Sequence, residues 1–259
     1  MKLVGLLLIL TPFFTQGQSK KIASIKTSTE VAYAAIDRAG DFYIVLKSGE
    51  IQKYDKNGVN LGSYVHEGEP TLFDPSNAIR LLVYYKKDQQ FSWLSPDLSV
   101  NPFQTVDPSL AIDPTLICPS GDQNIWILDN SDLSLKKVSL RDSRVLSEFS
   151  ISDQFKENRF MLMREYQNFL FLLDPKKGIM VYNSLGRLMR KVQTIGLTNF
   201  NFLGEELYYT ENAKVKFLDL FTAEARELPL PEPAQFVLLT DERMILTTSN
   251  RVEIFEFIP

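Results

Sequence analysis

The chain has 259 residues, 44% of them hydrophobic and 12% aromatic, with 28 basic against 32 acidic side chains. A chain this apolar can offset its ordering entropy by burial, which excludes a disordered protein, and its formal net charge of -4 argues against a nucleic-acid-binding protein. The single cysteine and the single histidine exclude a disulfide framework, a multi-thiolate metal site and a clustered-histidine zinc site.

The first 17 residues have the pattern of a secretory signal peptide. Lys2 supplies a positive charge, residues 3–10 are almost wholly apolar, and residues 15–17 offer a cleavage site ahead of Gln18. The apolar stretch is shorter than the roughly 20 residues of a membrane-spanning helix, which disfavours an anchor. We therefore expect a mature chain of residues 18–259, exported to the periplasm or outer envelope and without a membrane span. No cysteine follows the apolar run, so a lipoprotein is not expected.

Six units of short apolar runs, separated by polar turns, follow along the chain. The second run of each unit begins near Phe42, Ile79, Ile125, Phe169, Leu207 and Met244. In each third run, two apolar residues stand three apart before a polar turn residue: Ile51/Tyr54, Phe91/Leu94, Leu135/Val138, Ile179/Tyr182, Val215/Leu218 and Val252/Phe255. Repeats of roughly 40 residues with about four strands each are typical of propellers. The pattern predicts a single all-β domain, a six-bladed β-propeller with four-stranded blades.

The two ends of the chain predict how this ring closes. The sequence stops just after the third run of the last unit, so that blade is one strand short. Residues 22–29 form a spare strand-like segment ahead of the first unit. We expect this segment to pair with the last blade, because the pairing covers two sheet edges that would otherwise be exposed. No stretch keeps a helical pattern for three turns, so no helix is expected.

Two segments carry a family resemblance. Residues 35–58 read AIDRAGDFYIVLKSGEIQKYDKNG, and residues 177–186 read KGIMVYNSLG. The first resembles one blade of the six-bladed NHL-repeat and gluconolactonase-like (TolB-like) propellers, and the second resembles half of such a blade. For gluconolactonase-like enzymes the resemblance implies a channel-mouth metal, held by carboxylate and amide side chains, that activates water. The ligands of that family do not map onto this chain residue by residue. Gln18 after the predicted cleavage resembles the first residue of exported Bacteroidota proteins.

Acidic residues recur where the chain enters the predicted innermost strands. An acid precedes a proline at Glu69, Asp113 and Glu232, and Glu30 stands at the equivalent place in the first unit. If Glu69, Asp113 and Glu232 point into one channel mouth, they form a ring that suits calcium, a cation that prefers oxygen ligands. Glu30, Asn199 and Asn201 could then add to a binding site. Alternatively, each proline only begins a strand, where its missing N–H costs little, and the acid is a solvated turn residue. The sequence favours this second interpretation, without a metal or cofactor.

Further polar residues receive structural interpretations. His66, beside two glutamates, could be a base or a pH sensor, but a lone surface histidine is more often incidental. Cys118 is expected to be a small buried hydrophobe, since no second histidine can activate it. Acids that follow the innermost strands are expected to shape turns: Asp37, Asp74, Glu165 and Asp241. An arginine-rich site is not expected, because these arginines do not recur at one place in the unit: Arg80, Arg141, Arg144, Arg159 and Arg164.

Two functions from different classes fit these observations. The first is a non-catalytic exported module that binds a protein or envelope component through loops on one face. Long connections at residues 95–114 and 139–157 support it, because loops on a rigid scaffold commonly carry binding. The alternative is a metal-dependent lactonase-type hydrolase with its site at the channel mouth. The sequence favours the first, a protein–protein interaction or envelope-assembly module.

Overall fold

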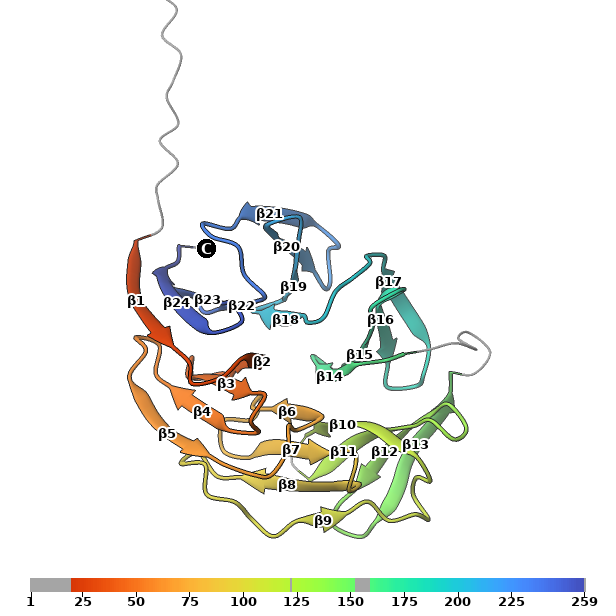
Figure 1. Ribbon diagram of the computed structural model, residues 1–259. Helices are drawn as coiled ribbons and strands as arrows, with labels where there is room; N and C mark the ends of the chain where they lie inside the picture. The colour runs from red at the N-terminus through yellow and green to blue at the C-terminus, as the bar shows by residue number, and fades with distance from the viewer. Residues whose placement is uncertain (1–19, 122, 152–158, 259) are drawn as a thin grey trace, which may run out of the picture.

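The computed structural model describes residues 20–121, 123–151 and 159–258. The predicted signal peptide lies outside these residues, as do residues 152–157 of the long connection 139–157. Within them, all regular structure is β, and the strands form six four-stranded antiparallel sheets arranged around a central channel (Figure 1). The predicted six-bladed β-propeller is therefore confirmed. No helix in the described part of the chain is long and apolar enough to cross a membrane.

Each of the first three blades is built from consecutive strands, ordered from the channel outward. Blade 1 contains β2 (Val31–Ile36), β3 (Phe42–Leu46), β4 (Ile51–Tyr54) and β5 (Asn60–Tyr64). Blade 2 contains β6 (Leu72–Asp74), β7 (Leu81–Tyr85), β8 (Gln90–Leu94) and β9 (Gln104–Thr105). Blade 3 contains β10 (Pro114–Ser120), β11 (Asn124–Asp129), β12 (Ser134–Ser139) and β13 (Arg144–Ser150).

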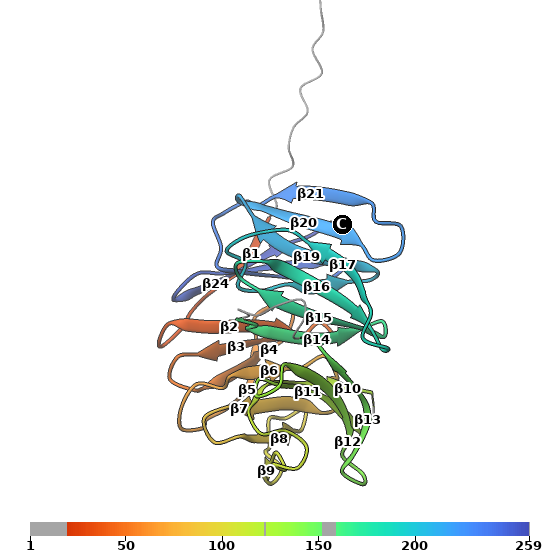
Figure 2. The same cartoon turned by 90° about the vertical axis from the view of Figure 1, so that its right-hand side faces the viewer.

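The next two blades follow the same rule, and the sixth takes one strand from the start of the chain. Blade 4, seen from the side in Figure 2, contains β14 (Leu162–Tyr166), β15 (Phe169–Asp174), β16 (Gly178–Asn183) and β17 (Leu188–Val192). Blade 5 contains β18 (Asn201–Leu203), β19 (Glu206–Glu211), β20 (Lys214–Asp219) and β21 (Ala225–Pro229). Blade 6 contains β22 (Phe236–Leu239), β23 (Arg243–Thr247), β24 (Arg251–Glu256) and β1 (Lys21–Lys26).

The repeated apolar runs correspond to the second and third strands of each blade. All six predicted third runs lie in β4, β8, β12, β16, β20 and β24. The second runs are placed correctly to within about two residues, the usual uncertainty of a strand boundary. Ile79 is the clearest departure, because it is 74% exposed and precedes β7. Its backbone N–H instead donates to the Asn77 side chain in the turn ahead of the strand.

The ring closes as the sequence predicts. β1 pairs antiparallel with β24, with Ser24 opposite Glu253 and Lys26 opposite Arg251. The Ser24 hydroxyl donates to a Glu253 carboxylate oxygen at 3.0 Å, and the N–H of Thr27 donates to the carbonyl of Asn250 at 3.1 Å. The strand is shorter than the predicted segment, because the chain turns away after Lys26 toward β2 (Figure 1).

Apolar clusters between neighbouring blades form the core. One joins blades 1 and 6, another joins blades 1 and 2, and a third joins blades 5 and 6. A larger cluster extends from blade 2 through blades 3 and 4 to blade 5. The middle strands supply most of this packing; every side chain of β3 and of β7 is buried. Each blade is therefore covered by its neighbours on both faces, which is why the second runs read as continuous apolar stretches.

A β-bulge recurs where the last strand of a blade begins. In blades 1, 3, 4 and 6, the pairing skips one residue opposite the end of the third strand. The skipped residue is Leu61 in β5, Leu146 in β13, Met189 in β17 and Ile22 in β1. A bulge twists its strand and re-aims the extra side chain. The same irregularity, with an apolar residue in it, therefore repeats around the rim of the propeller.

The closure predicts a specific loss of stability. Deleting residues 20–29 removes the β1–β24 ladder and its packed side chains, so the free energy of unfolding should fall by about 3–6 kcal/mol. Urea denaturation, compared with a chain that starts at Lys20, measures the change. The control is Lys20→Ala, which removes only an exposed ion pair with Glu256 and should change stability little. Equal unfolding midpoints for the deletion and the parent would contradict the closure.

Candidate functional site

The central channel has a cavity at each mouth. The exit cavity lies where innermost strands end and turn outward; its volume is about 400 Å³, and its lining includes Asp37, Arg38, Arg164, Asn201 and Thr240. The entrance cavity lies where the chain enters the innermost strands; its volume is about 300 Å³, and its lining includes Tyr33, Glu69, Pro70, Met161 and Phe236. The sequence predicts the binding site at the entrance. The charged side chains that line the exit make it the stronger candidate site.

Arg164 on β14 is the central polar residue between the two cavities. Its side chain is buried, with 6% exposure, and it joins three blades. One terminal nitrogen donates to the side-chain oxygen of Asn201 on β18, and the other donates to the hydroxyl of Tyr33 on β2 at 2.8 Å. Tyr33 lines the entrance cavity, whereas Arg164 and Asn201 line the exit cavity. This network therefore separates the two mouths of the channel.

The charge of Arg164 is not neutralised by direct contact. In the described part of the chain, no carboxylate makes an ion pair with it. Burial lowers the pKa of Arg164, but its interactions with Tyr33 and with buried Asp74 outweigh that effect and raise the pKa overall. The guanidinium is therefore a permanent buried cation. Its Nε–H and the side-chain nitrogen of Asn201 have no hydrogen-bond partner, which leaves the network incomplete.

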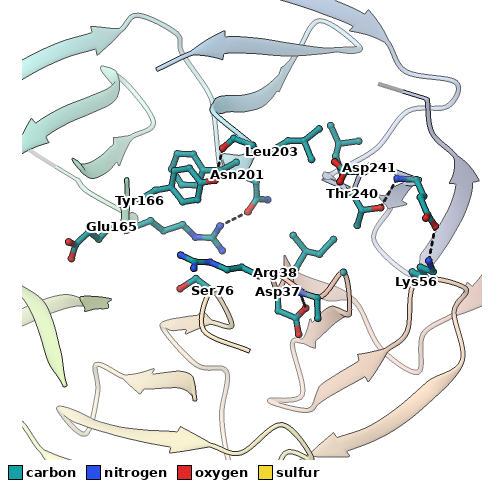
Figure 3. Close-up of a pocket in the computed structure, with 18 residues that line it drawn as sticks. Asp37, Arg38, Lys56, Ser76, Glu165, Tyr166, Asn201, Leu203, Thr240 and Asp241 are labelled. Carbon is teal, nitrogen blue, oxygen red and sulfur yellow. Dashed lines mark hydrogen bonds and ion pairs between the residues drawn. The ribbon is translucent and has the colours of Figure 1, made fainter. Parts of the chain in front are cut away.

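Polar and aromatic groups surround the exit cavity. Figure 3 shows Arg38 and Ser76 pointing into the cavity opposite Asn201, while Glu165 extends away from its middle. Tyr166 stacks on Phe202 with ring centroids 4.1 Å apart and nearly parallel planes, which forms a flat wall beside the arginine. The exit cavity can therefore present cationic groups on one side and an aromatic surface on another.

The structure does not bring the predicted acids together. Glu30 forms an ion pair with Lys47, and this contact lowers the pKa of Glu30. Glu232 forms an ion pair with Lys21 on β1, with 2.7 Å between nitrogen and oxygen. Glu69 is exposed at the rim of the entrance cavity. Asp113 accepts a hydrogen bond from the Asn130 amide at 3.0 Å.

No metal-binding group emerges from these positions. Across residues 20–121, 123–151 and 159–258, no three His, Cys, Asp or Glu side chains are arranged to hold a metal ion, and Glu69, Asp113 and Glu232 are all within those ranges. Asn199 lies just before β18 beside a small gap, with its side-chain oxygen buried and without a hydrogen-bond partner. Of the three acid–proline pairs, only Asp113-Pro114 directly starts a strand, β10.

His66 and Cys118 have structural surroundings. The His66 ring lies 4.2 Å from the ring of Tyr85 and 5.1 Å from that of Phe103, measured between centroids. Its Nδ1 is 2.9 Å from the carbonyl oxygen of Glu67. Cys118 on β10 is fully buried, and burial raises the pKa of its thiol well above the usual value. The thiol is therefore protonated at neutral pH, as the expected buried hydrophobe would be.

Two of the four predicted turn acids have the expected role. Asp37 accepts hydrogen bonds from the N–H groups of Ala39 and Asp41, and Asp74 accepts one from the N–H of Ser76. Asp241 lies in the connection between β22 and β23. Glu165 differs, because it lies within β14 and accepts a hydrogen bond from the indole N–H of Trp126 at 2.9 Å. The orientation of Glu165 is therefore fixed by a contact between blades 3 and 4 rather than by a turn of its own segment.

The importance of Arg164 is not apparent from the repeat pattern, in which it is one of several arginines that do not recur at one place in the unit. The available signal was local: Arg164 follows an apolar run, residues 160–163, in a strand expected to be innermost. A single cation in a buried strand must be paired or functional, because an unpaired buried charge is costly. Its partners Tyr33 and Asn201 could not be identified without the closed ring.

The comparisons with known proteins concern the fold. No protein-family model and no curated protein matches the chain. Among solved structures, virginiamycin B lyase from Staphylococcus aureus has a TM-score of 0.55 and 13% identity, covering 88% of this chain and 80% of that chain. The computationally designed Ika8 protein has a TM-score of 0.54 and 10% identity, covering 92% and 100%. BBS1N in complex with ARL6DN has a TM-score of 0.54 and 14% identity, covering 85% and 75%.

At these identities the likeness shows the propeller fold alone. One of these similar structures is a lyase, another is in a protein complex and a third is a design, so the fold does not select among functions. The narrower resemblance to NHL-repeat and gluconolactonase-like propellers, and to Bacteroidota proteins, stays a prediction.

A buried carboxylate fixes the loop that carries Asp113. Asp129, at the end of β11, accepts hydrogen bonds from the N–H groups of Ile112 at 3.0 Å and Asp113 at 3.1 Å, and from the ammonium of Lys136 at 3.0 Å. Burial raises the pKa of Asp129, but hydrogen bonds from Ser131 and from these N–H groups lower it well below its ordinary value. The carboxylate form therefore stabilises the folded chain.

The low pKa of Asp129 predicts pH-dependent stability. Because the folded-state pKa is below the unfolded value of about 3.9, its contribution is present above about pH 4 and is lost as pH falls toward the folded-state pKa. Asp129→Asn should lower the free energy of unfolding by about 2–4 kcal/mol at pH 7, with a smaller difference from wild type below about pH 4. Urea unfolding at several pH values measures this. Asp88→Asn, at an exposed position in the turn between β7 and β8, is the control and should change little at either pH; a pH-independent loss for Asp129→Asn would contradict the assignment.

Proposed function

We propose that the chain is an exported, non-catalytic propeller that binds a protein partner, as an interaction or envelope-assembly module. The observation that carries this proposal is the row of apolar side chains at the rim bulges. Leu61, Leu146 and Met189 occupy equivalent bulge positions in blades 1, 3 and 4, and their exposures are 50%, 51% and 51%. Such side chains mark an interaction surface where they adjoin one another on a rigid scaffold.

Exposed apolar side chains of blades 3 and 4 lie where these two blades meet. The Ser147 hydroxyl donates to the carbonyl of Ser184, so β13 lies beside the turn between β16 and β17. The ring of Phe149 lies against Gly186 so closely that a Cβ at that glycine would be 2.3 Å from it. This contact brings together what we call the blade 3–4 edge patch, whose members are exposed: Val145, Leu146, Leu185 and Met189.

The charges beside this patch suggest the chemistry of its partner. Basic side chains flank the patch on the same segments: Arg141, Arg144, Arg187, Arg190 and Lys191. Arg144 forms an ion pair with Asp142, and Glu148 is the other acid of residues 141–150. Residues 183–192 contain no acid. We infer a protein partner that inserts apolar side chains between carboxylates, since complementary charge around an apolar centre sets orientation and association rate.

The reactive side chains support a non-catalytic role. His66 is engaged by Tyr85 and Phe103, and the Cys118 thiol is buried and protonated. Arg164 and Asn201 can bind and orient a group, but neither is a general base at neutral pH. The proposal therefore includes no cofactor, and the blade 3–4 edge patch carries the function.

Export is the part of the proposal that rests on sequence. Residues 1–17 have the pattern of a signal peptide. Export brings the blade 3–4 edge patch into the compartment where envelope proteins can bind it. We expect protein recovered from the periplasm or medium of an expressing bacterium to begin at Gln18. Mass spectrometry of the N-terminal peptide checks this, with total cell protein as the control. An intact Met1 terminus on exported protein would contradict it.

The partner proposal is tested by site-directed photo-crosslinking. A benzophenone amino acid in place of Leu146 should form one discrete protein adduct in cells, whereas the same group at Phe221, an exposed position on blade 5, should not. The adducted protein, purified separately, should bind the wild-type chain. Leu146→Ser with Met189→Ser should weaken this binding at least tenfold, which is about 1.4 kcal/mol. The matched control Phe221→Ser should bind normally.

Two results would contradict the proposal. One is the absence of a discrete adduct at Leu146. The other is equal binding of the purified protein by wild type and by the Leu146→Ser, Met189→Ser variant. Both positions are exposed, so the substitutions should leave stability nearly unchanged, and thermal unfolding of each variant verifies that binding differences are not folding differences.

A further inference from the structure

The exit cavity contains a buried cation whose hydrogen bonding is incomplete. Arg164 is 94% shielded from solvent, as its 6% exposure shows, and its direct partners Tyr33 and Asn201 are both neutral. The guanidinium Nε–H and the Asn201 side-chain nitrogen both lack a hydrogen-bond partner. The charge of buried Asp74 acts on Arg164 but no ion pair joins them, and a buried charge without a directly bound counter-ion is expensive. An anionic oxygen at this place would supply both the missing charge and the missing acceptors.

Most acids around the cavity are already engaged elsewhere. Asp37 accepts a hydrogen bond from the Tyr43 hydroxyl at 2.9 Å in addition to its turn contacts. Glu165 is held by Trp126, and Glu242 forms an ion pair with Lys56 at 2.7 Å. Asp241 is the remaining acid of the lining, in the connection between β22 and β23. The cationic groups near Arg164 are therefore not compensated by these carboxylates.

Arg38 adds a second available cation. It lies in the turn between β2 and β3, it is exposed, and it makes no hydrogen bond or ion pair with any other described residue. Figure 3 shows its side chain extending into the cavity alongside Ser76 and opposite Asn201. Two guanidinium groups, one fixed and one free to move, thus face the same space from blades 4 and 1. Arginine is well suited to this task, because its planar donors match the two oxygens of a carboxylate.

The remaining walls are suited to an organic body. Leu203, Leu239 and Ile36 line the cavity, and the stacked rings of Tyr166 and Phe202 form a flat surface beside it. A volume of about 400 Å³ is at the lower end of the range for small-molecule sites, about 300–1,000 Å³. Apolar walls contribute nothing to a bare inorganic ion, whereas they favour a ligand with carbon atoms behind its charged group.

We propose that the exit cavity binds a small organic acid, with its carboxylate between Arg164 and Arg38 and its apolar body against Tyr166 and Leu203. The Asn201 side-chain nitrogen donates to the same carboxylate. This site is distinct from the blade 3–4 edge patch and does not depend on it. A single negative charge fits better than a phosphate dianion, because Asp241 belongs to the same lining.

Calorimetric titration with sodium benzoate, at constant ionic strength and pH 7, tests the proposal on the full mature chain. Benzoate is expected to bind with one site per chain and more tightly than acetate, which lacks the apolar body, or inorganic phosphate. Arg38→Ala, a change at an exposed position, should weaken benzoate binding at least tenfold. The matched control Arg251→Ala removes an exposed arginine from β24, away from the exit cavity and from the edge patch, and should bind as wild type does. Arg164→Met should abolish binding.

Three results of these titrations would overturn the proposal. Absence of benzoate binding, phosphate binding as tight as benzoate binding, or unchanged affinity in Arg38→Ala would each do so. Because Arg164→Met could fail to fold, Asn201→Leu provides a second internal variant, for which a loss of benzoate affinity of at least fivefold is expected and wild-type affinity would contradict the site. Circular dichroism of every variant, measured before titration, verifies the fold.

Discussion

The backbone ladder between β1 and β24 is the interaction on which the rest of the structure depends. Five blades are complete within consecutive stretches of chain, but the sixth exists only because the first strand joins the last. The two ends of the sequence are thereby held in one sheet, and the cluster between blades 1 and 6 can form. This contact therefore helps to keep the innermost strands facing one another across the channel.

The polar network in the channel follows from this closure. Tyr33 belongs to blade 1, Arg164 to blade 4 and Asn201 to blade 5, so they meet only in a closed ring. Propeller cores are apolar between the blades, whereas the channel is the place where polar groups can converge at low solvent exposure. Arg164 therefore depends on ring closure for its position, and it supplies a charge to the exit cavity. The rim bulges are independent of the channel, since they arise from local pairing within single blades.

The sequence predicts the architecture well for physical reasons that particular residues show. Pairs such as Ile51/Tyr54 and Val252/Phe255 indicate a strand followed by a turn. This pattern depends only on residues that are close in the sequence, so it can be recognised without the structure. Ile79 precedes its strand by two residues and is included in the predicted run because an apolar residue in a turn resembles the start of a strand. The proline in Asp113-Pro114 does begin β10, but Glu69-Pro70 and Glu232-Pro233 precede their strands by short connections.

The candidate site could not be predicted in the same way. Glu232 has a lysine partner, Lys21, from a strand at the far end of the sequence, and Glu30 has Lys47 from the adjacent connection. Such pairings depend on side-chain direction, which apolar periodicity does not report. Arg164 shows the same limit, because its significance comes from what surrounds it rather than from its place in the repeat. A rule that examines single charged residues inside predicted buried strands would have found it.

The bulges at the rim have a consequence for behaviour at high protein concentration. An outermost strand with a regular row of free N–H and C=O groups can add a strand from another molecule, which leads to sheet extension between molecules. In β5, β13 and β17 the extra residue interrupts that row and twists the strand. β21 has no such interruption, but it carries Arg226 and Glu227 and ends in Pro229, which cannot donate to a neighbouring backbone. The rim can thus expose apolar side chains while its backbone resists edge-to-edge joining of propellers.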